Sequence, residues 1–304
     1  MISHIARIKT TATLSQEMDS SVAEPVTVYS LTNEHEQEVL AFLSARPIHT
    51  VAMAGFIRDN GLVSTLNRGT FYACRNSQGN LEGIALIGHI NLIETRTDRA
   101  LEAFARVAQQ CSRTHLIMGE QERIEEFWSY YTEAGQQRRL ACRELLFELH
   151  PSVMPKQSAP ELRLATSEDL ELVMPVQAQM AFEESGVNPM EKDPEGFRLR
   201  CLRRIHQGRT WVWVENNELI FKADIMADTP EVIYLEGIWV NSKARGQGIG
   251  MRCMSQLACT LLKQTKSICL LVNEQNEDVH RFYQKAGYKV VSRYDTIFLE
   301  QENS

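Results

Sequence analysis

One glycine-rich stretch, WVNSKARGQGIGMRCMSQL, has residue types and spacing that suit the binding of an anion. Gly246, Gly248 and Gly250 follow an apolar run and precede a segment with the pattern of a helix. Glycine lets the backbone approach a ligand closely and adopt positive φ. The N–H groups and dipole at the start of a helix attract phosphate groups. The stretch therefore predicts an anion-binding turn between a strand and a helix.

Two common phosphate loops do not fit this stretch. A Walker loop needs Gly-Lys followed by Ser or Thr, and the sequence has none there. The dinucleotide fingerprint would begin at Gly246 and need a glycine at the position of Met251. The pattern that remains is R-x-x-G-x-G, from Arg245 to Gly250, with Val240 five residues before the arginine. A tight turn that simply needs several glycines is the alternative reading.

A second motif follows in VNEQNEDVHRFYQKAGYKVV. Together the two motifs resemble the GNAT superfamily of acyl-CoA-dependent N-acetyltransferases. The first matches the pattern V-x-x-x-x-R-G-x-G-x-G without a gap, from Val240 to Gly250. The second resembles N-x-x-A-x-x-F/L-Y-x-x-x-G-F/Y, with Val279 in place of alanine and matches at Asn276, Tyr283, Gly287 and Tyr288. The resemblance covers residues 161–300.

The resemblance implies that acetyl-CoA is the acyl donor and that no metal is needed. Backbone amides of the glycine loop would hold its pyrophosphate, with Arg245 adding charge, and the pantetheine arm would lie along a strand. The residues expected to bind acetyl-CoA are Ile238, Trp239, Val240, Arg245, Gly246, Gln247, Gly248, Ile249, Gly250, Asn273 and Asn276. The two asparagines have an alternative role, as caps of the helix that follows them.

The resemblance also implies that an amine attacks the thioester directly, so that no protein nucleophile is required. Tyr283 matches the general acid that protonates the departing thiolate, and its alternative role is that of a core aromatic residue. Glu236 is the candidate base, because burial in VIYLEGIWV would raise its pKa. Its alternative is a solvent-facing position beside a bulge at Gly237.

The acceptor site of such an enzyme is expected between the first two helices of the domain. Phe182, Glu183 and Glu184 fall there, and carboxylates would suit a cationic amine, but a solvated acidic loop is the favoured explanation. Lys222 and Asp224 alternate with apolar residues on one strand. For this pair we expect a structural salt bridge.

The elements that must position these residues can be read from periodicity and caps. A strand and a helix capped by Thr166 and Asp169 come first, followed by a helix that begins at Asp193 and ends at Gly208. RTWVWVE and ELIFKADIM form a hairpin around an Asn-Asn turn, and EVIYLEGIWV is a third strand. After the loop come a helix near 250–264, a strand, a helix that ends at Gly287, and the last strands.

Residues 26–149 repeat this order of elements, from VTVYSLT to RELLFELH, without a glycine loop. Where the loop should fall, the sequence is ETRTDRALEAF, and Phe127-Trp128 stand in place of Phe282-Tyr283. The sequence therefore predicts an α/β protein of two GNAT-like domains, each with a mixed, mostly antiparallel sheet flanked by helices. The expected division is a polar tail at 1–25, a degenerate domain at 26–149, a linker at 150–160 and a catalytic domain at 161–304.

Composition narrows the function classes. The formal net charge of -7 gives no general grip on phosphate backbones, so nucleic acid is not an expected partner. Seven scattered cysteines without a C-x-x-C pair favour neither a disulfide framework nor a zinc site. No apolar run is long enough for a membrane span, and we expect a cytoplasmic protein. The sequence leaves the oligomeric state open.

The predicted function is transfer of an acetyl group from acetyl-CoA to a primary amine, on either a small molecule or a protein. The alternative is a catalytically inactive acyl-CoA-binding sensor. The first half is expected to serve as a scaffold and not as a second enzyme.

Overall fold

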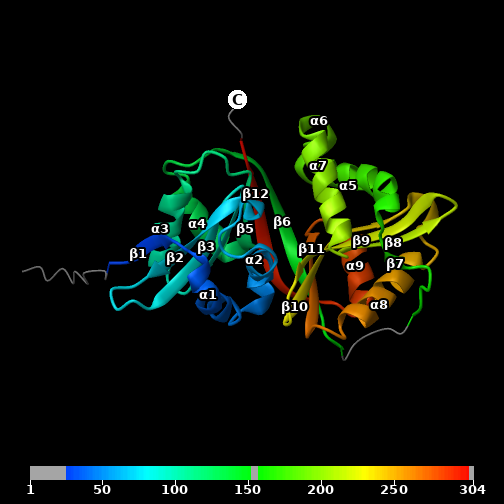
Figure 1. The fold of residues 1–304 in the computed structure, drawn as a ribbon, viewed down its shortest axis with the longest axis horizontal. Coiled ribbons are helices and arrows are strands. Elements are labelled where there is room, and N and C mark those ends of the chain that lie inside the picture. Colours follow the sequence, from blue (N-terminus) through cyan, green and yellow to red (C-terminus); the bar gives the residue numbers. More distant parts are fainter. Residues whose placement is uncertain (1–24, 152–156, 301–304) are drawn as a thin grey trace, which may run out of the picture.

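The computed structural model describes residues 25–151 and 157–300 (Figure 1). The predicted tail lies outside these residues except for its last position, and the predicted linker lies partly outside them. One sheet of 12 strands runs through the described chain, with helices on both of its faces (Figure 1).

The described residues of the first half form six strands and four α-helices, in the order that the sequence predicts apart from one additional helix. The strands are β1 (Thr27–Ser30), β2 (Gly69–Arg75), β3 (Leu81–Gly88), β4 (Ile90–Thr95), β5 (Leu116–Glu120) and β6 (Arg138–Leu149). The helices are α1 (Glu36–Leu43), α2 (Pro47–Asn60), α3 (Asp98–Ala108) and α4 (Gln121–Tyr131).

The second half repeats the arrangement. Its strands are β7 (Arg163–Leu164), β8 (Thr210–Glu215), β9 (Glu218–Asp228), β10 (Val232–Val240), β11 (Ser267–Asn273) and β12 (Lys289–Leu299). Its helices are α5 (Leu170–Ser185), the short α6 (Pro189–Lys192), α7 (Pro194–His206), α8 (Ile249–Leu261) and α9 (Glu277–Lys285).

The two halves share their last strands. The strand order is β1-β2-β3-β4-β5-β12-β6-β11-β10-β9-β8-β7. Strand β12, from the end of the chain, lies between β5 and β6 and is antiparallel to both, and β6 in turn pairs with β11. Each half therefore completes the other half's sheet with its own last strand. The predicted fold class is confirmed, but the two sheets form one continuous structure.

Within each half, one pair of neighbouring strands is parallel. Strand β4 pairs with β5 over Ile90–Leu92, and β10 pairs with β11 over Val232–Tyr234. The remaining pairs are antiparallel. Strand β10 continues to Val240 after its pairing with β11 has ended, so the two strands diverge on the side where the glycine loop lies.

Local sequence signals place several element ends as predicted. Thr166 and Asp169 form a reciprocal capping box. Asp193 caps α7 by accepting a hydrogen bond from Gly196 N at 2.9 Å, and Pro194 is the first residue of that helix. Asn216 and Asn217 both have positive φ in the β8–β9 turn. The signals are local because each cap uses residues within one turn of the helix.

The sequence interpretation missed helix α2. Its segment, PIHTVAMAGFIRDN, has apolar residues on several faces, so a one-sided helical pattern is weak. The structure gives the reason: α2 packs against α1 on one side and against β9 and β10 of the second half on the other. Pro47 at its first position and Gly61 at its end were the available signals.

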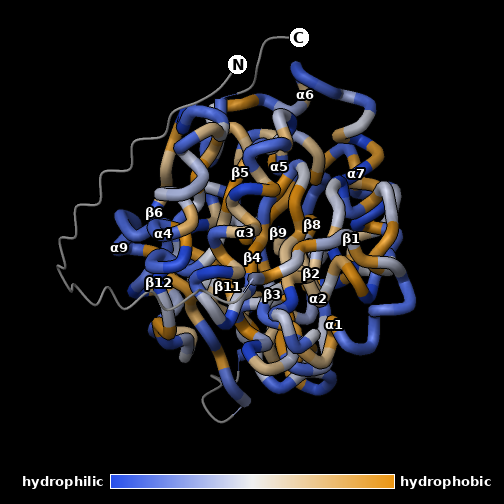
Figure 2. The backbone as a smooth tube through the Cα atoms, turned by 90° about the vertical axis from the view of Figure 1, so that its left-hand side faces the viewer, coloured by the Kyte–Doolittle hydropathy of each residue, from blue (hydrophilic) through white to orange (hydrophobic). Residues whose placement is uncertain are grey.

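The core is layered on the two faces of the sheet. Helices α3 and α4 cover one face of the first half, and α8 and α9 cover the corresponding face of the second half. Helices α1 and α2, and α5 and α7, cover the other face. Hydrophobic residues concentrate along the inner strands, and hydrophilic residues lie in the outer loops (Figure 2).

Candidate functional site

The glycine loop joins the end of β10 to the start of α8, as the sequence predicts. A single turn of 3₁₀-helix, Ser242–Ala244, leads into it. Gly246 and Gly248 have φ of 75° and 77°, and nothing lies within 4 Å of the place where a Cβ would stand at either residue. Gly250 is closely packed, since a Cβ there would lie 3.3 Å from Val240 Cγ2. The first two glycines thus serve an open turn, and the third serves helix packing.

The loop presents a row of backbone donors. From Gly246 to Met251, no backbone N–H donates to an acceptor within the described residues. The first helical bond across the junction is from Arg252 N to Gly248 O, at 3.1 Å. Residues Arg245 to Gly248 are exposed, so these donors are open to solvent at the positive end of α8. The arrangement is that of an anion site.

Two side chains brace the loop. Arg245 donates from Nε to Val240 O at 3.1 Å, and Gln247 donates from Nε2 to Lys243 O at 2.9 Å. These bonds tie the loop to the end of β10 and to the preceding turn. Arg245 therefore has a structural bond of its own, while its guanidinium stays exposed beside the open amides.

The edge of β10 beyond Tyr234 faces the gap where β10 and β11 diverge. Ile238, Trp239 and Val240 form the end of this edge, half-buried and directly before the loop. On its other side, β10 pairs with β9, with Trp239 opposite Lys222. The edge can therefore accept an extended ligand, which would pair with the strand as a neighbour does.

Glu236 lies on β10 at a break in the β9–β10 register, beside Gly237 with φ of 59°. The bulge considered for this position is thus present. Its side chain is 32% exposed, and its carboxylate forms a salt bridge with Arg204 Nη1 of α7 at 2.8 Å. The sequence left a buried position and a solvent-facing position open for Glu236, and the structure gives it a partly exposed position with Arg204 as its counter-charge. A role as the base stays a prediction.

Two further carboxylates come close to Glu236. Glu184 lies in the last turn of α5, so the expected acidic loop is in fact helical. Crowding by protein atoms and the charges of Glu236 and Glu144 raise the pKa of Glu184 to about 7, although its side chain still faces solvent. Glu144 comes from β6 of the first half. Burial raises its pKa, while a hydrogen bond from Thr296 at 2.7 Å opposes that shift.

Tyr283 lies in α9 and is only 5% exposed, within the core that α8 and α9 form with the sheet. Burial raises the pKa of its hydroxyl. Its ring packs edge-on against Phe282 and Tyr288. The structure thus shows the core packing of the alternative reading. A role as proton donor stays a prediction.

The two asparagines are bonded to their own backbone neighbours. Asn276 caps α9 by accepting from Val279 N at 3.3 Å, and Asn273 accepts from Gln275 N at 2.9 Å. Both bonds belong to the capping and turn role that the sequence left open for these residues. Contacts with a pantetheine arm stay a prediction for both.

Lys222 and Asp224 form the predicted structural salt bridge, and both are fully buried. Thr210 Oγ1 donates to Asp224 at 2.8 Å, and Arg204 Nη1 lies 3.1 Å from the same carboxylate. Burial alone would raise the pKa of Asp224, but the charges of Lys222 and Arg204 lower it. The cluster holds Arg204 in place below Glu236.

The first half differs from the second at the loop, as the sequence predicts. Helix α3 begins three residues after β4, and Thr97 caps it by accepting from Ala100 N at 3.4 Å. No open glycine turn stands there. The sequence analysis set Trp128 opposite Tyr283, and this equivalence is corrected. Tyr131 and Tyr283 each lie four residues before the glycine that follows the helix, Gly135 or Gly287, so Tyr131 is the residue that corresponds to Tyr283. Tyr131 is also fully buried.

The sequence interpretation missed Arg204 and Glu144 as site residues. Arg204 lies among several arginines on α7, and no local pattern singles it out. Glu144 lies far away in the chain and reaches the site only because β6 pairs with β11. Within the described residues, no group of three or more His, Cys, Asp or Glu side chains could hold a metal ion. No helix there has the length and apolar character needed to cross a membrane.

Comparisons with known proteins agree with this geometry. Residues 177–288 match the family model "Acetyltransferase (GNAT) family". No curated protein sequence matches the chain. Among solved structures, a GNAT-family acetyltransferase from Colwellia psychrerythraea is 11% identical, with a TM-score of 0.56, and the match covers 91% of this chain and 100% of that one.

Two other solved structures have the same fold over most of their length. A Drosophila protein is 13% identical, with a TM-score of 0.62, and the match covers 91% of this chain and 99% of that one. A tandem GNAT protein from the clavulanic acid biosynthesis pathway is 12% identical, with a TM-score of 0.54, and the match covers 92% of this chain and 100% of that one. The chain is therefore a tandem GNAT-fold protein whose second half contains an acetyltransferase (GNAT) family domain.

Proposed function

We propose that the second half is an N-acetyltransferase that moves an acetyl group from acetyl-CoA to a primary amine. The observation that carries the proposal is the run of open backbone N–H groups from Gly246 to Met251, at the start of α8 and beside the free edge of β10. In this proposal the loop binds the pyrophosphate. The pantetheine arm lies along Ile238 to Val240, with its thioester pointing toward Glu236.

The divergence of β10 from β11 supports this placement. It leaves backbone groups unpaired on one side of β10, and an amide-containing arm can pair with them as an added strand would. A backbone N–H of the same edge can stabilise the oxyanion that forms when the amine attacks. No protein nucleophile is needed, so the seven free cysteines have no required part in the reaction.

The reaction needs two proton transfers. An ordinary alkyl amine has a pKa of roughly 10.4, so at neutral pH it is almost entirely protonated. It must lose this proton before its nitrogen can attack the carbonyl carbon. In the proposal Glu236 takes this proton, directly or through water, and Arg204 positions its carboxylate. Tyr283 gives a proton to the sulfur as the C–S bond breaks. Its burial keeps the hydroxyl protonated, as a donor must be.

The acceptor approaches from the side of Glu184 and Glu144. The charges of Glu236 and Glu144 both act on Glu184, and this acidic side suits a positively charged amine more than an anionic one. A comparison of small amines with peptides as acceptors decides whether the acceptor is a small metabolite or a protein amine.

The test is release of CoA thiol from acetyl-CoA by the full chain, measured with a panel of amines that includes polyamines, amino sugars and peptides with free N-termini or lysines. The proposal expects release that depends on the amine and equals the amount of acetylated amine found by mass spectrometry. Binding of acetyl-CoA without release by any amine of the panel would contradict it.

That contrary result would instead support an acyl-CoA-binding sensor. Two observations favour this second candidate: Glu236 is ion-paired with Arg204, and Tyr283 is packed in the core. Both properties also fit a resting enzyme whose site is completed by the donor. Turnover therefore separates the two functions, and CoA binding alone does not.

A further inference from the structure

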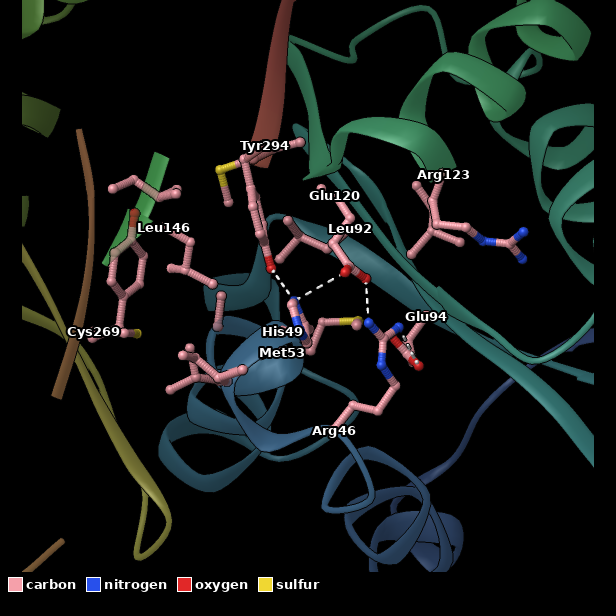
Figure 3. A pocket seen from close by; sticks show the side chains of 18 of the residues that line it. Arg46, His49, Met53, Leu92, Glu94, Glu120, Arg123, Leu146, Cys269 and Tyr294 are labelled. Carbon is pink, nitrogen blue, oxygen red and sulfur yellow. Dashed lines mark hydrogen bonds and ion pairs between the residues drawn. The ribbon is translucent and has the colours of Figure 1, made fainter. Parts of the chain in front are cut away.

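A pocket that is separate from the glycine loop lies where the two halves meet (Figure 3). Its walls come from α2, α3, α4, β4 and β5 of the first half, from β10 and β11 of the second half, and from the shared strands β6 and β12. The empty space is about 710 Å³, part of which is open solvent at the mouth.

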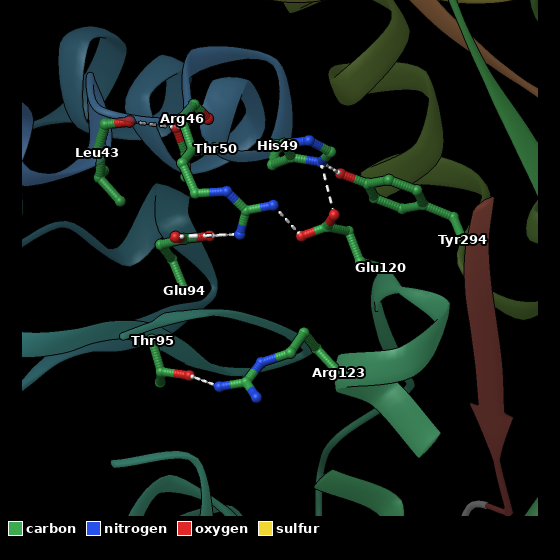
Figure 4. A network of polar contacts seen from close by, with 9 residues as sticks. All are labelled: Leu43, Arg46, His49, Thr50, Glu94, Thr95, Glu120, Arg123 and Tyr294. Atoms are coloured by element: carbon green, nitrogen blue, oxygen red, sulfur yellow. Dashed lines mark hydrogen bonds and ion pairs between the residues drawn. The ribbon is translucent and has the colours of Figure 1, made fainter. Parts of the chain in front are cut away.

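One end of the pocket is lined by a connected polar network (Figure 4). Arg46 Nη1 donates to both oxygens of Glu94 at 3.3 Å, and Arg46 Nη2 donates to Glu120 at 2.5 Å. His49 Nδ1 lies 3.4 Å from Glu120 and 3.0 Å from the hydroxyl of Tyr294. The network joins α2 and β4 of the first half to the last strand of the chain.

The charges that line the pocket balance. Two arginines, Arg46 and Arg123, and two glutamates, Glu94 and Glu120, belong to the lining, so the formal charges of the lining sum to zero. Arg123 also pairs with Asp98 and Glu126, which lie outside the lining. His49 adds none at neutral pH, because burial lowers its pKa and Arg46 acts in the same direction, although Glu120 opposes the shift. A ligand with a single net charge would upset this balance. A ligand with one positive and one negative group would not.

The network has unused bonding capacity. Each glutamate oxygen can accept more than one hydrogen bond, and Arg46 reaches Glu94 only through long bonds. The side chain of Glu94 is 8% exposed, and burial raises its pKa against the effect of Arg46. A second cation beside Glu94 would therefore be stabilised. Arg46 and Arg123 keep 40% and 32% of their side chains exposed, so an anion can reach them. At Arg123 the anion would share the guanidinium with Asp98, Glu126 and Thr95.

The other end of the pocket is apolar. Leu146 and Cys269 lie there, away from Arg46 and Glu94 (Figure 3). Leu271 and Ile48 complete the apolar wall. The pocket is therefore amphipathic along its length, with charged groups at one end and hydrocarbon at the other.

We propose that this pocket binds a zwitterionic α-amino acid with an apolar side chain. The ammonium group lies between Glu94 and Glu120, the carboxylate receives hydrogen bonds from Arg46 and Arg123, and the side chain fills the space over Leu146. Charge-assisted hydrogen bonds of this kind are the stronger ones in proteins.

This site goes beyond the proposed acetyl transfer and does not depend on it. The first half has no open glycine turn, so the amino acid here is a bound ligand and is not acetylated at this site. Its binding is measured without CoA. If leucine does not bind, the proposed acetyl transfer still stands. If no amine is acetylated, the proposed amino-acid site still stands.

The test is calorimetric titration of the full chain with L-leucine, isopentylamine and isocaproate, which share the same branched hydrocarbon. The amine lacks the carboxylate, and the acid lacks the ammonium group. Leucine is expected to bind, and each analogue should bind roughly tenfold more weakly or worse, because a charged hydrogen-bonded group has been removed. No binding of leucine at millimolar concentrations, or equal binding of either analogue, would overturn the proposal.

Two variants locate the site. Glu94→Gln should weaken leucine binding at least tenfold, while Glu102→Gln, an exposed glutamate on α3, should leave it unchanged. Ala52→Leu adds hydrocarbon to a lining position on α2, so it should abolish binding with the thermal transition maintained. This second variant keeps the test valid if Glu94→Gln does not fold. Leucine binding that survives Ala52→Leu would place the ligand elsewhere and overturn the assignment.

Discussion

At the scale of single residues, the two halves keep the same carboxylate and differ in what surrounds it. Leu92 opposes Met118 and Tyr234 opposes Cys269 at matching points of the two parallel strand pairs. Two residues further along, these strands carry Glu94 and Glu236. Each glutamate pairs with an arginine of the helical layer, Arg46 or Arg204. The polar pair thus stands in both halves, while only the second half has the anion loop.

Tyr283→Phe removes one hydroxyl and leaves the buried ring in place. If Tyr283 donates a proton to the leaving sulfur, kcat falls on the order of 10²-fold while the Kd for acetyl-CoA changes little. Steady-state thiol release and calorimetry give the two quantities. Tyr131→Phe, at the corresponding position of the first half, is the matched control. An unchanged kcat would return Tyr283 to a purely structural role.

Glu184→Gln tests the electrostatics of the acidic side of the site. The pKa of Glu184 is raised to about 7 in the folded chain, above an ordinary value of 4.5, so the folded state binds more protons between these pH values. The contribution of this group to the free energy of unfolding therefore falls as pH rises from about 4.5 to 7. Glutamine does not titrate, so the variant does not lose stability in this way.

The measurement is the free energy of unfolding by urea at pH 5 and pH 8. We compare the free energy of unfolding of Glu184→Gln with that of the natural chain at each pH. The variant's advantage should be larger at pH 8 than at pH 5. A stability difference that is the same at both pH values would show that Glu184 titrates normally.

At the scale of elements, most of the fold could be predicted because its signals are local. The capping box at Thr166 and the Asn216-Asn217 turn depend on neighbouring residues only, and both stand where predicted. The loop before α8 was likewise predictable from its glycines. Helix α2 was not, because its apolar residues face partners from both halves. Glu144 was not either, because strand pairing between halves brings it to the site.

Gly55 of α2 tests the contact between this helix and the second half. A Cβ at Gly55 would lie 2.6 Å from Ala227 Cβ on β9. Gly55→Ala improves helix propensity by about 1 kcal/mol, but overpacking costs about 1–3 kcal/mol, so a net loss of up to about 2 kcal/mol is expected. Adding Ala227→Gly should recover part of the loss in urea unfolding. A stabilised Gly55→Ala variant would show that α2 sits further from β9.

At the scale of the whole molecule, the exchange of β6 and β12 makes the halves depend on each other. Strand β6 pairs with β11 and β12 along its length, and β12 fills the space beside β5. The side chain of Glu144 and the core residue Phe147 reach the second half through this strand. The predicted division at 149/161 describes the sequence, but each folded unit needs a strand from the other.

Cutting the chain between the halves should therefore yield fragments that fold only together. Fragments 1–154 and 155–304, produced in the same cells, are expected to form a 1:1 complex with the circular dichroism of the intact chain. Fragment 155–304 alone lacks β6 and should be unfolded or aggregated. A monomeric, cooperatively folded fragment 155–304 would contradict the dependence of the second half on the first.

The central claim is that the loop of the second half is the acyl-CoA site, and calorimetry of CoA binding to Gly248→Glu tests it most directly. The added carboxylate stands at the open amides, and a side chain is strained at φ of 77°. Gly79→Glu is the matched control, because Gly79 has φ of 83° in an exposed first-half turn with nothing within 4 Å. The account predicts at least a tenfold loss of CoA affinity in Gly248→Glu and none in Gly79→Glu. Equal CoA affinity of Gly248→Glu and the natural chain would contradict it.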